Sequence, residues 1–246
     1  MDAGTRRPGG LRSAGRKLRV LGLRGIGLAL LHRLTGRVSL TQLQLPGLPH
    51  PVYLRIGTRD FRDYWRAFED QELAFDLRGP RVIVDGGSGA GFSALWFASR
   101  YPMATVYAIE MERSNFAVLD LNSAPYLNIV PARAAISGQM GKLIIPNPGR
   151  GHWGFRLTDA PEGGQTVTGI TMGRLLDHYN LDRVDVLKLD IDMGLADEVF
   201  EDGSNWVHRV DTIVAAQRMN GEAFTAATAG FPVRWQRGST RHLSRY

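Results

Sequence analysis

The sequence contains no cysteine, which excludes disulfides, thiolate metal sites and cysteine nucleophiles. It has only three lysines, Lys17, Lys142 and Lys188, and none of them follows a tyrosine by four positions. The Tyr-x-x-x-Lys pair of short-chain dehydrogenases is therefore absent. No apolar run is long enough to span a bilayer, and no Asn-x-Ser/Thr signal occurs. These absences fit a reducing compartment, and we expect a cytoplasmic protein.

Acidic residues are scarce at both ends of the chain. Of the 246 residues, positions 1–40 carry nine basic side chains and one acid, and positions 231–246 carry four arginines and no acid. The net charge of +6 thus belongs to the ends, and the middle of the chain is acidic overall. A nucleic-acid enzyme usually spreads its basic surface around the active cleft, so nucleic acid is not the expected partner.

Residues 1–50 are expected to form a basic tail and a basic amphipathic helix over about 12–34. This helix either docks on the following domain or makes a peripheral contact with an anionic membrane surface. Docking is favoured, because a surface helix in a globular protein has the same pattern. Residues 51–246 are long enough for a single domain, with a Gly/Pro-rich insertion near 146–164 that would form a loop over the pocket.

Strand-like and helix-like segments alternate from residue 81 onward, after a short strand over 52–56 and a helix from Asp60, its N-cap, to Phe75. The expected strands are 82–85, 104–109, 129–136, 142–145, 165–171, 184–190 and 210–215, and the expected helices are 91–100, 113–122, 172–179, 194–200 and 221–228. This alternation predicts an α/β fold with a mainly parallel sheet and helices on both faces. Ligands of such a sheet bind at the carboxyl ends of its strands.

A glycine loop, Asp85-Gly86-Gly87-Ser88-Gly89-Ala90-Gly91, joins the strand over 82–85 to a helix. A strand, a glycine loop and a helix N-terminus together direct backbone N–H groups at a polar ligand. A dinucleotide fingerprint, Gly-x-Gly-x-x-Gly, would have its third glycine at Phe92. The third glycine here is Gly91, so the spacing does not favour a dinucleotide.

The acid at the strand end, Asp85, would repel a pyrophosphate but suits a ligand with an ammonium group, such as the methionine moiety of S-adenosylmethionine. Glu110 stands 25 residues later, at the end of the next strand, where it can accept hydrogen bonds from both ribose hydroxyls. Met111 would pack on the adenine. The predicted cofactor site is completed by the loop residues Gly87, Ser88, Gly89 and Gly91.

These motifs resemble the FkbM family of class I methyltransferases over roughly residues 52–220. The matching segments are the glycine loop, 107–112, 135–137 and 184–192. The resemblance implies a Rossmann-like class I methyltransferase fold with a seven-stranded, mostly parallel sheet. It also implies an S-adenosylmethionine-dependent O-methyltransferase whose acceptor is a hydroxyl on a sugar, glycolipid or natural product, and it assigns Ala135 to the adenine contact.

Asp190 is the first candidate for a general base, because it ends a strand on the side of the expected sulfonium. Lys188 projects to the same face of that strand, where it would orient Asp190, lower its pKa or form a structural ion pair. In the insertion, His152 and Trp153 either contact substrate or face solvent. Asp192 either binds a ligand or begins the next helix. No metal site is predicted.

Two departures from the family pattern favour an alternative function. The family has Glu-Gly-Ala-Glu where this chain has Asp192-Met193-Gly194-Leu195-Ala196, and a later strand ends in Gln217 in place of Glu. Both changes remove carboxylates near the expected pocket, so the alternative is a catalytically impaired binding protein with the same fold. Base methylation of nucleic acid usually needs an Asn/Asp-Pro-Pro-aromatic element, which Asp190-Ile191-Asp192-Met193 lacks.

Overall fold

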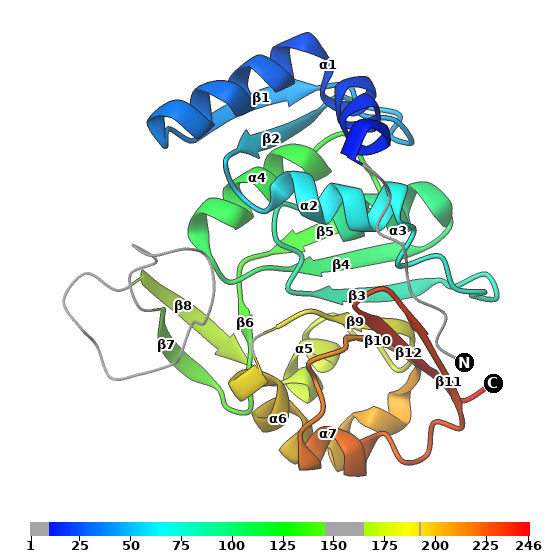
Figure 1. Cartoon of the computed structure of the whole chain (residues 1–246). Helices are drawn as coiled ribbons and strands as arrows, with labels where there is room; N and C mark the ends of the chain where they lie inside the picture. The colour runs from blue at the N-terminus through cyan, green and yellow to red at the C-terminus, as the bar shows by residue number, and fades with distance from the viewer. Residues whose placement is uncertain (1–9, 146–164, 192) are drawn as a thin grey trace. The chain divides into compact units, whose positions relative to one another are not determined.

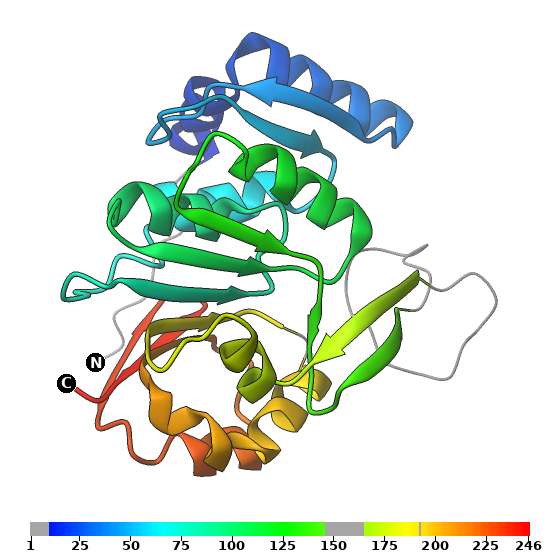
Figure 2. The same ribbon diagram turned by 180° about the vertical axis from the view of Figure 1, so that it is seen from behind.

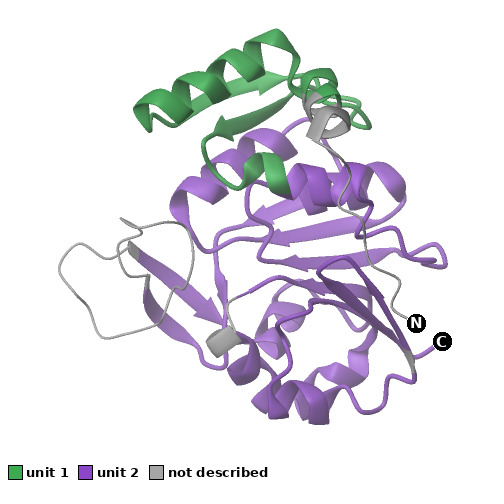
Figure 3. Cartoon of the chain, in the orientation of Figure 1, with its two compact units in different colours: residues 1–62 green, residues 63–246 purple. Residues whose placement is uncertain are grey.

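The computed structural model describes residues 10–145, 165–191 and 193–246. The chain divides into two compact units, residues 1–62 and residues 63–246 (Figure 3). The domain boundary predicted between residues 50 and 51 stays a prediction. Within the described ranges, no helix has the length and apolar character needed to cross a membrane.

Unit 1 contains a long helix and a two-stranded antiparallel hairpin. Helix α1 (Gly10–Thr35) matches the helix expected over 12–34, with a kink at Gly22, where φ is 63°. Strands β1 (Ser39–Leu43) and β2 (Val52–Ile56) form the hairpin. At Gly57, which follows β2, a Cβ atom would come within 2.4 Å of His32 Nδ1. The ring of His32 in α1 therefore lies directly against the backbone of Gly57 at the end of the hairpin.

The helix that the sequence predicts from Phe61 to Phe75, after Asp60 as its N-cap, is shorter in the structure. Helix α2 (Asp60–Tyr64) continues only as one π-helical segment, η1 (Trp65–Glu69). The backbone leaves helical geometry at Gln71, where φ is 52°. Asp60 is the first residue of α2, and its carboxylate accepts hydrogen bonds from the backbone and the guanidinium of Arg55 at 2.8–2.9 Å.

Unit 2 is built on a seven-stranded sheet, which confirms the predicted fold class. Its order is β11-β12-β10-β9-β3-β4-β5, and the run from β10 to β5 is parallel, whereas β12 is antiparallel to both of its neighbours. The chain winds from β3 outward to β5 and later from β9 outward to β10 (Figure 1). Sites form where strand order reverses in this way, here between β3 and β9. The strands are β3 (Val82–Gly86), β4 (Thr105–Ile109), β5 (Ile129–Ala132), β9 (Val184–Leu189), β10 (Val210–Ala216), β11 (Val233–Arg237) and β12 (Thr240–Ser244).

Helices cover both faces of this sheet, as the alternating pattern predicts (Figures 1 and 2). Helices α3 (Phe92–Arg100) and α4 (Arg113–Ser123) lie on one face. The other face carries α5 (Met172–His178), α6 (Met193–Glu201) and α7 (Glu222–Ala227), together with the short 3-10 turns η2 (Gly203–Asn205) and η3 (Val207–Arg209). Side chains from these elements join β9 and β10 in one large apolar core around Trp206, which is fully buried.

A small second sheet has the order β6-β8-β7, from β6 (Ala135–Ile136), β7 (Gly141–Ile145) and β8 (Gln165–Ile170). The single strand predicted over 129–136 is therefore wrong, because the chain leaves the main sheet after Ala132 and pairs with β8 from Ala135. Strands β1, β11 and β12 were not predicted from the sequence. The Gly/Pro-rich insertion over 146–164 lies outside the described residues.

Candidate functional site

The glycine loop lies where the carboxyl ends of β3 and β9 separate. Asp190 N donates to Gly86 O at 3.0 Å, and the chain then turns at Gly87, where φ is 74°. A Cβ atom on Gly87 would lie 2.4 Å from Asp190 O, so only glycine fits this position. The N–H groups of Gly87 and Ser88 donate to Ile109 O at 2.9 and 3.1 Å, which folds the loop over the end of β4.

Glu110, which follows β4, is bonded to this loop. Its Oε2 accepts from Gly89 N at 2.8 Å, and its Oε1 accepts from Glu112 N at 2.9 Å and from Asn115 Nδ2 at 3.3 Å. The side chain is buried, and this burial raises the pKa of Glu110 although the backbone hydrogen bonds oppose the rise. The structure thus brings together the glycine loop and the acid that was predicted to bind the ribose.

Asp85 and Lys188 form a buried ion pair below the loop. Lys188 Nζ lies 2.8 Å from Asp85 Oδ1 and donates to Gly87 O at 2.9 Å, and Ser93 Oγ donates to Asp85 Oδ2 at 2.6 Å. Asp85 is fully buried. We expected this carboxylate to meet the ammonium group of a ligand, but the chain supplies that ammonium itself. Lys188 pairs with Asp85 and not with Asp190.

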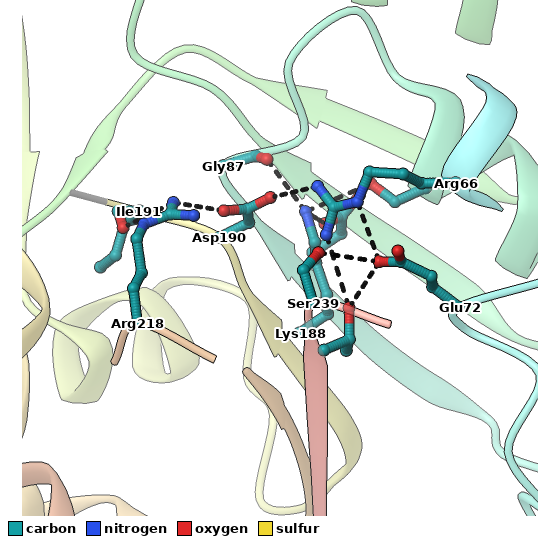
Figure 4. Close-up of polar contacts among 11 residues, drawn as sticks. Arg66, Glu72, Gly87, Lys188, Asp190, Ile191, Arg218 and Ser239 are labelled. Carbon is teal, nitrogen blue, oxygen red and sulfur yellow. Dashed lines mark hydrogen bonds and ion pairs between the residues drawn. The ribbon is translucent and has the colours of Figure 1, made fainter. Parts of the chain in front are cut away.

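Asp190 is held between two arginines from distant parts of the chain (Figure 4). Arg66 Nη1 lies 3.4 Å from its Oδ2, and Arg218 Nη2 bonds its Oδ1. Burial raises the pKa of Asp190, but the positive charges of Lys188, Arg218 and Arg66 outweigh burial and lower that pKa to about 2. Lys188 therefore lowers the pKa of Asp190 without contacting it.

Arg66 also belongs to a polar network that the sequence analysis missed (Figure 4). Its Nε donates to Glu72 Oε2 at 2.9 Å, and the same oxygen accepts from Ser239 Oγ at 3.0 Å and from Thr240 Oγ1 at 3.1 Å. The π-helical segment η1 carries Arg66 toward these partners, and such segments are frequent at functional sites. Network partners far apart in sequence leave no local pattern that could have revealed them.

A pocket with about 550 Å³ of empty space, including open solvent, adjoins the loop. Among the predicted site residues it is lined by Gly87, Ser88, Gly89, Lys188 and Asp190. New lining residues include Asp63, whose Oδ2 lies 3.9 Å from the position of a Cβ on Gly89. The pocket wall thus carries both signs of charge beside the backbone of the glycine loop.

The remaining predicted residues, Asp85, Gly91, Glu110, Met111 and Ala135, are not among the residues that line the pocket. Met111 packs against the apolar cluster of Ala135, Leu143 and Val167, so the two residues assigned to adenine are brought together. Gly91 has φ of 95° and begins α3, and a Cβ there would lie 2.9 Å from Leu119 Cδ1. Gly91 therefore serves the packing of α4 against the loop.

Three residues of the sequence analysis, His152, Trp153 and Asp192, lie outside the described residues. Over the parts of the chain that the structure describes, no group of three or more His, Asp or Glu side chains could hold a metal ion.

No protein-family model matches the sequence, and a search of curated proteins finds no significant match. Solved methyltransferase structures are similar. The methyltransferase FkbM from Methylobacillus flagellatus KT is 13% identical with a TM-score of 0.47, over 73% of this chain and 47% of the other. This chain thus spans about half the length of that protein.

Two further structures show the same level of similarity. The mitomycin 7-O-methyltransferase MmcR is 11% identical with a TM-score of 0.45, over 75% of this chain and 53% of the other. TYW2 of M. jannaschii, in complex with AdoMet, is 14% identical with a TM-score of 0.43, over 85% and 84%. Similarity at this level carries no functional argument, so function has to be argued from the residues of the site.

Proposed function

We propose that this protein is an S-adenosylmethionine-dependent methyltransferase that modifies a hydroxyl oxygen on a sugar, glycolipid or natural product. The observation that carries the proposal is the bond between Glu110 and Gly89. It fixes the carboxylate that follows β4 to the glycine loop that follows β3, beside the point where strand order reverses. In nucleotide-binding α/β folds, an acid at a strand end binds the ribose hydroxyls, and a glycine loop lets the ligand approach the backbone closely.

The residues present fit S-adenosylmethionine. Glu110 would hold the ribose, Met111 and the Ala135 cluster would contact the adenine, and the loop from Gly87 to Gly89 would support the methionine part. The carboxylate of Asp63 lines the pocket, where it would attract the ligand's ammonium group. When bound, S-adenosylmethionine supplies an electrophilic methyl group on a positively charged sulfur.

Asp190 would act on the acceptor hydroxyl. With a pKa of about 2, its carboxylate is ionised at neutral pH and is only a weak base. It accepts a hydrogen bond from the hydroxyl, orients that oxygen and takes its proton late, when the oxygen has become acidic through bond formation. Arg66 and Arg218 hold the carboxylate in place, so positioning contributes more than basicity.

A catalytically impaired binding protein is the second candidate. The observation that favours it is the engagement of both Asp190 oxygens by arginines, which leaves fewer lone pairs for a substrate. Gln217, which stands where the FkbM family has a glutamate, also favours a binding protein because a carboxylate is missing there. This candidate shares the cofactor site and differs only in the absence of methyl transfer.

Incubation with S-adenosylmethionine labelled in the methyl group, followed by mass spectrometry of sugar, glycolipid and small-molecule fractions, tests the proposal. We expect label on a hydroxyl oxygen, lost in Glu110→Gln and retained in Asp120→Asn, an exposed acid of α4. Cofactor binding without label in any fraction would favour the binding protein. Label on nucleic acid or on a carbon atom would overturn the O-methyltransferase assignment.

A further inference from the structure

Helix α1 exposes a row of leucines to solvent. Leu23, Leu30 and Leu34 have exposed fractions of 83%, 57% and 85%. Their spacing of seven and four residues places them on one stripe of the helix, with the exposed Gly27 between them. Scattered exposed leucines are ordinary, but a continuous row on one helix face marks an interaction surface.

The opposite face of the same helix is already packed. Gly25 is buried, and His32 lies against Gly57 beside the hairpin, within unit 1. The His32 carbonyl also accepts from Gly36 N at 2.7 Å, and Thr35 Oγ1 donates to Leu31 O at 2.8 Å. These two carbonyls of the last helical turn thus have hydrogen-bond donors. The helix is therefore ordered without its leucine stripe being covered.

Arginines flank the stripe. At about 100° per residue, Arg24 lies one step to one side of it and Arg33 one step to the other, and both are exposed. The exposed Arg37 follows the helix. Between Asp2 and Asp60 the sequence has no acidic residue, and Asp60 is buried against Arg55. In the described part of unit 1 the leucine stripe thus has cationic neighbours and no exposed carboxylate.

We infer that this face of α1 binds the surface of an anionic lipid bilayer, with the leucines in the interface and the arginines at the headgroups. An apolar stripe edged by cations is what such a surface requires. A symmetric pair of copies would bring arginines against arginines with no acid to offset them. A nucleic acid would neutralise the arginines but leave the leucines in water. The inference is independent of the proposed methyl transfer.

Co-sedimentation of the full chain with phosphatidylcholine vesicles, with and without phosphatidylserine, tests it. We expect binding only with phosphatidylserine, weakened by salt. Leu30→Ser/Leu34→Ser should weaken it about tenfold, and Arg24→Gln/Arg33→Gln about tenfold or more. Matched controls are Met103→Ser/Leu127→Ser, exposed by 71% and 103%, and the exposed Arg174→Gln.

Three results would overturn the inference. The first is no sedimentation with phosphatidylserine vesicles at low salt. The second is binding that the leucine variant retains in full while its thermal unfolding is unchanged. The third is a concentration-dependent dimer that the leucine variant abolishes, which would make this face an interface between copies.

Discussion

The Lys188 ammonium lies 2.8 Å from a carboxylate oxygen of Asp85, and Asp85 is fully buried beneath the glycine loop. Because the same nitrogen donates to Gly87 O, one ion pair connects β3, β9 and the loop between β3 and α3. The shape of the candidate cofactor site therefore depends on a buried charge pair.

Removal of the Lys188 charge should lower the free energy of unfolding. Lys188→Met leaves the Asp85 carboxylate buried without its partner, which costs about 3–5 kcal/mol of unfolding free energy. Urea denaturation measures this loss. The control is Lys142→Met, an exposed lysine of β7, with an expected change of about 0.5 kcal/mol or less. The double variant Asp85→Asn/Lys188→Met should recover part of the loss, and no recovery would argue against a direct pair.

Two glycines of the loop should respond differently to alanine. Gly87→Ala places a Cβ 2.4 Å from Asp190 O, whereas a Cβ on Gly89 meets only Asp63 Oδ2, at 3.9 Å. Both have positive φ, of 74° and 57°. Gly89→Ala should cost about 1–2 kcal/mol from backbone strain alone. Gly87→Ala should cost about 3 kcal/mol or more, because a backbone clash is added. Equal unfolding free energies for the two variants would contradict this geometry.

The ion pairs of Asp190 should make stability depend on acid pH. Its pKa falls from 3.8 to about 2 on folding, because the charges of Lys188, Arg218 and Arg66 outweigh burial. A lowered carboxyl pKa stabilises the fold above the unfolded value, and this gain, about 2 kcal/mol, disappears as the pH falls toward 2. Between pH 5 and pH 3, the wild type should lose about 1 kcal/mol more than Asp190→Asn. An equal loss of stability in the wild type and in Asp190→Asn would show that the ion pairs of Asp190 do not stabilise the fold.

His242 should make the free energy of unfolding depend on pH in a second, higher range. Its ring is buried between Phe75 and Trp235, with ring centroids at 4.5 and 4.9 Å, and burial lowers the pKa of His242 to about 4. The unfolded chain binds the proton more readily, so stability is greatest above pH 6.5 and falls as the ring must be protonated. Urea unfolding should show a loss of about 2 kcal/mol between pH 8 and pH 5.

His242→Phe should remove this dependence, because phenylalanine keeps the stacked packing and does not titrate. The exposed His208→Gln should leave the dependence unchanged. A persistent loss of stability in His242→Phe would assign the pH dependence to another group.

The centre of the fold and the cofactor side of the site could be predicted from local sequence patterns. The strands β3, β4 and β9 are rich in apolar residues because most of their side chains are buried, although Asp185 and Lys188 interrupt the run in β9. The glycine loop and Glu110 follow directly after such strands, so their positions could be predicted from strand ends alone. Neither prediction needed knowledge of distant contacts.

Long-range contacts could not be predicted in the same way. Arg66 reaches Asp190 across 124 positions of sequence, and Arg218 reaches it across 28. Strand β12 was missed because its buried side chains include Thr240 and His242, which give no apolar pattern. The pairing of Asp85 with Lys188 could not be predicted for a similar reason, since the register between β3 and β9 decides that Lys188 lies opposite Asp85.

Calorimetric titration of S-adenosylhomocysteine into the wild type and Glu110→Gln tests the central claim most directly. The account predicts binding by the wild type and by Asp120→Asn. It predicts a loss in Glu110→Gln of about tenfold or more, because a charged hydrogen bond contributes about 1.5–3 kcal/mol. Absence of heat with the wild type, or equal affinity in wild type and Glu110→Gln, would contradict the assignment of this loop as the cofactor site.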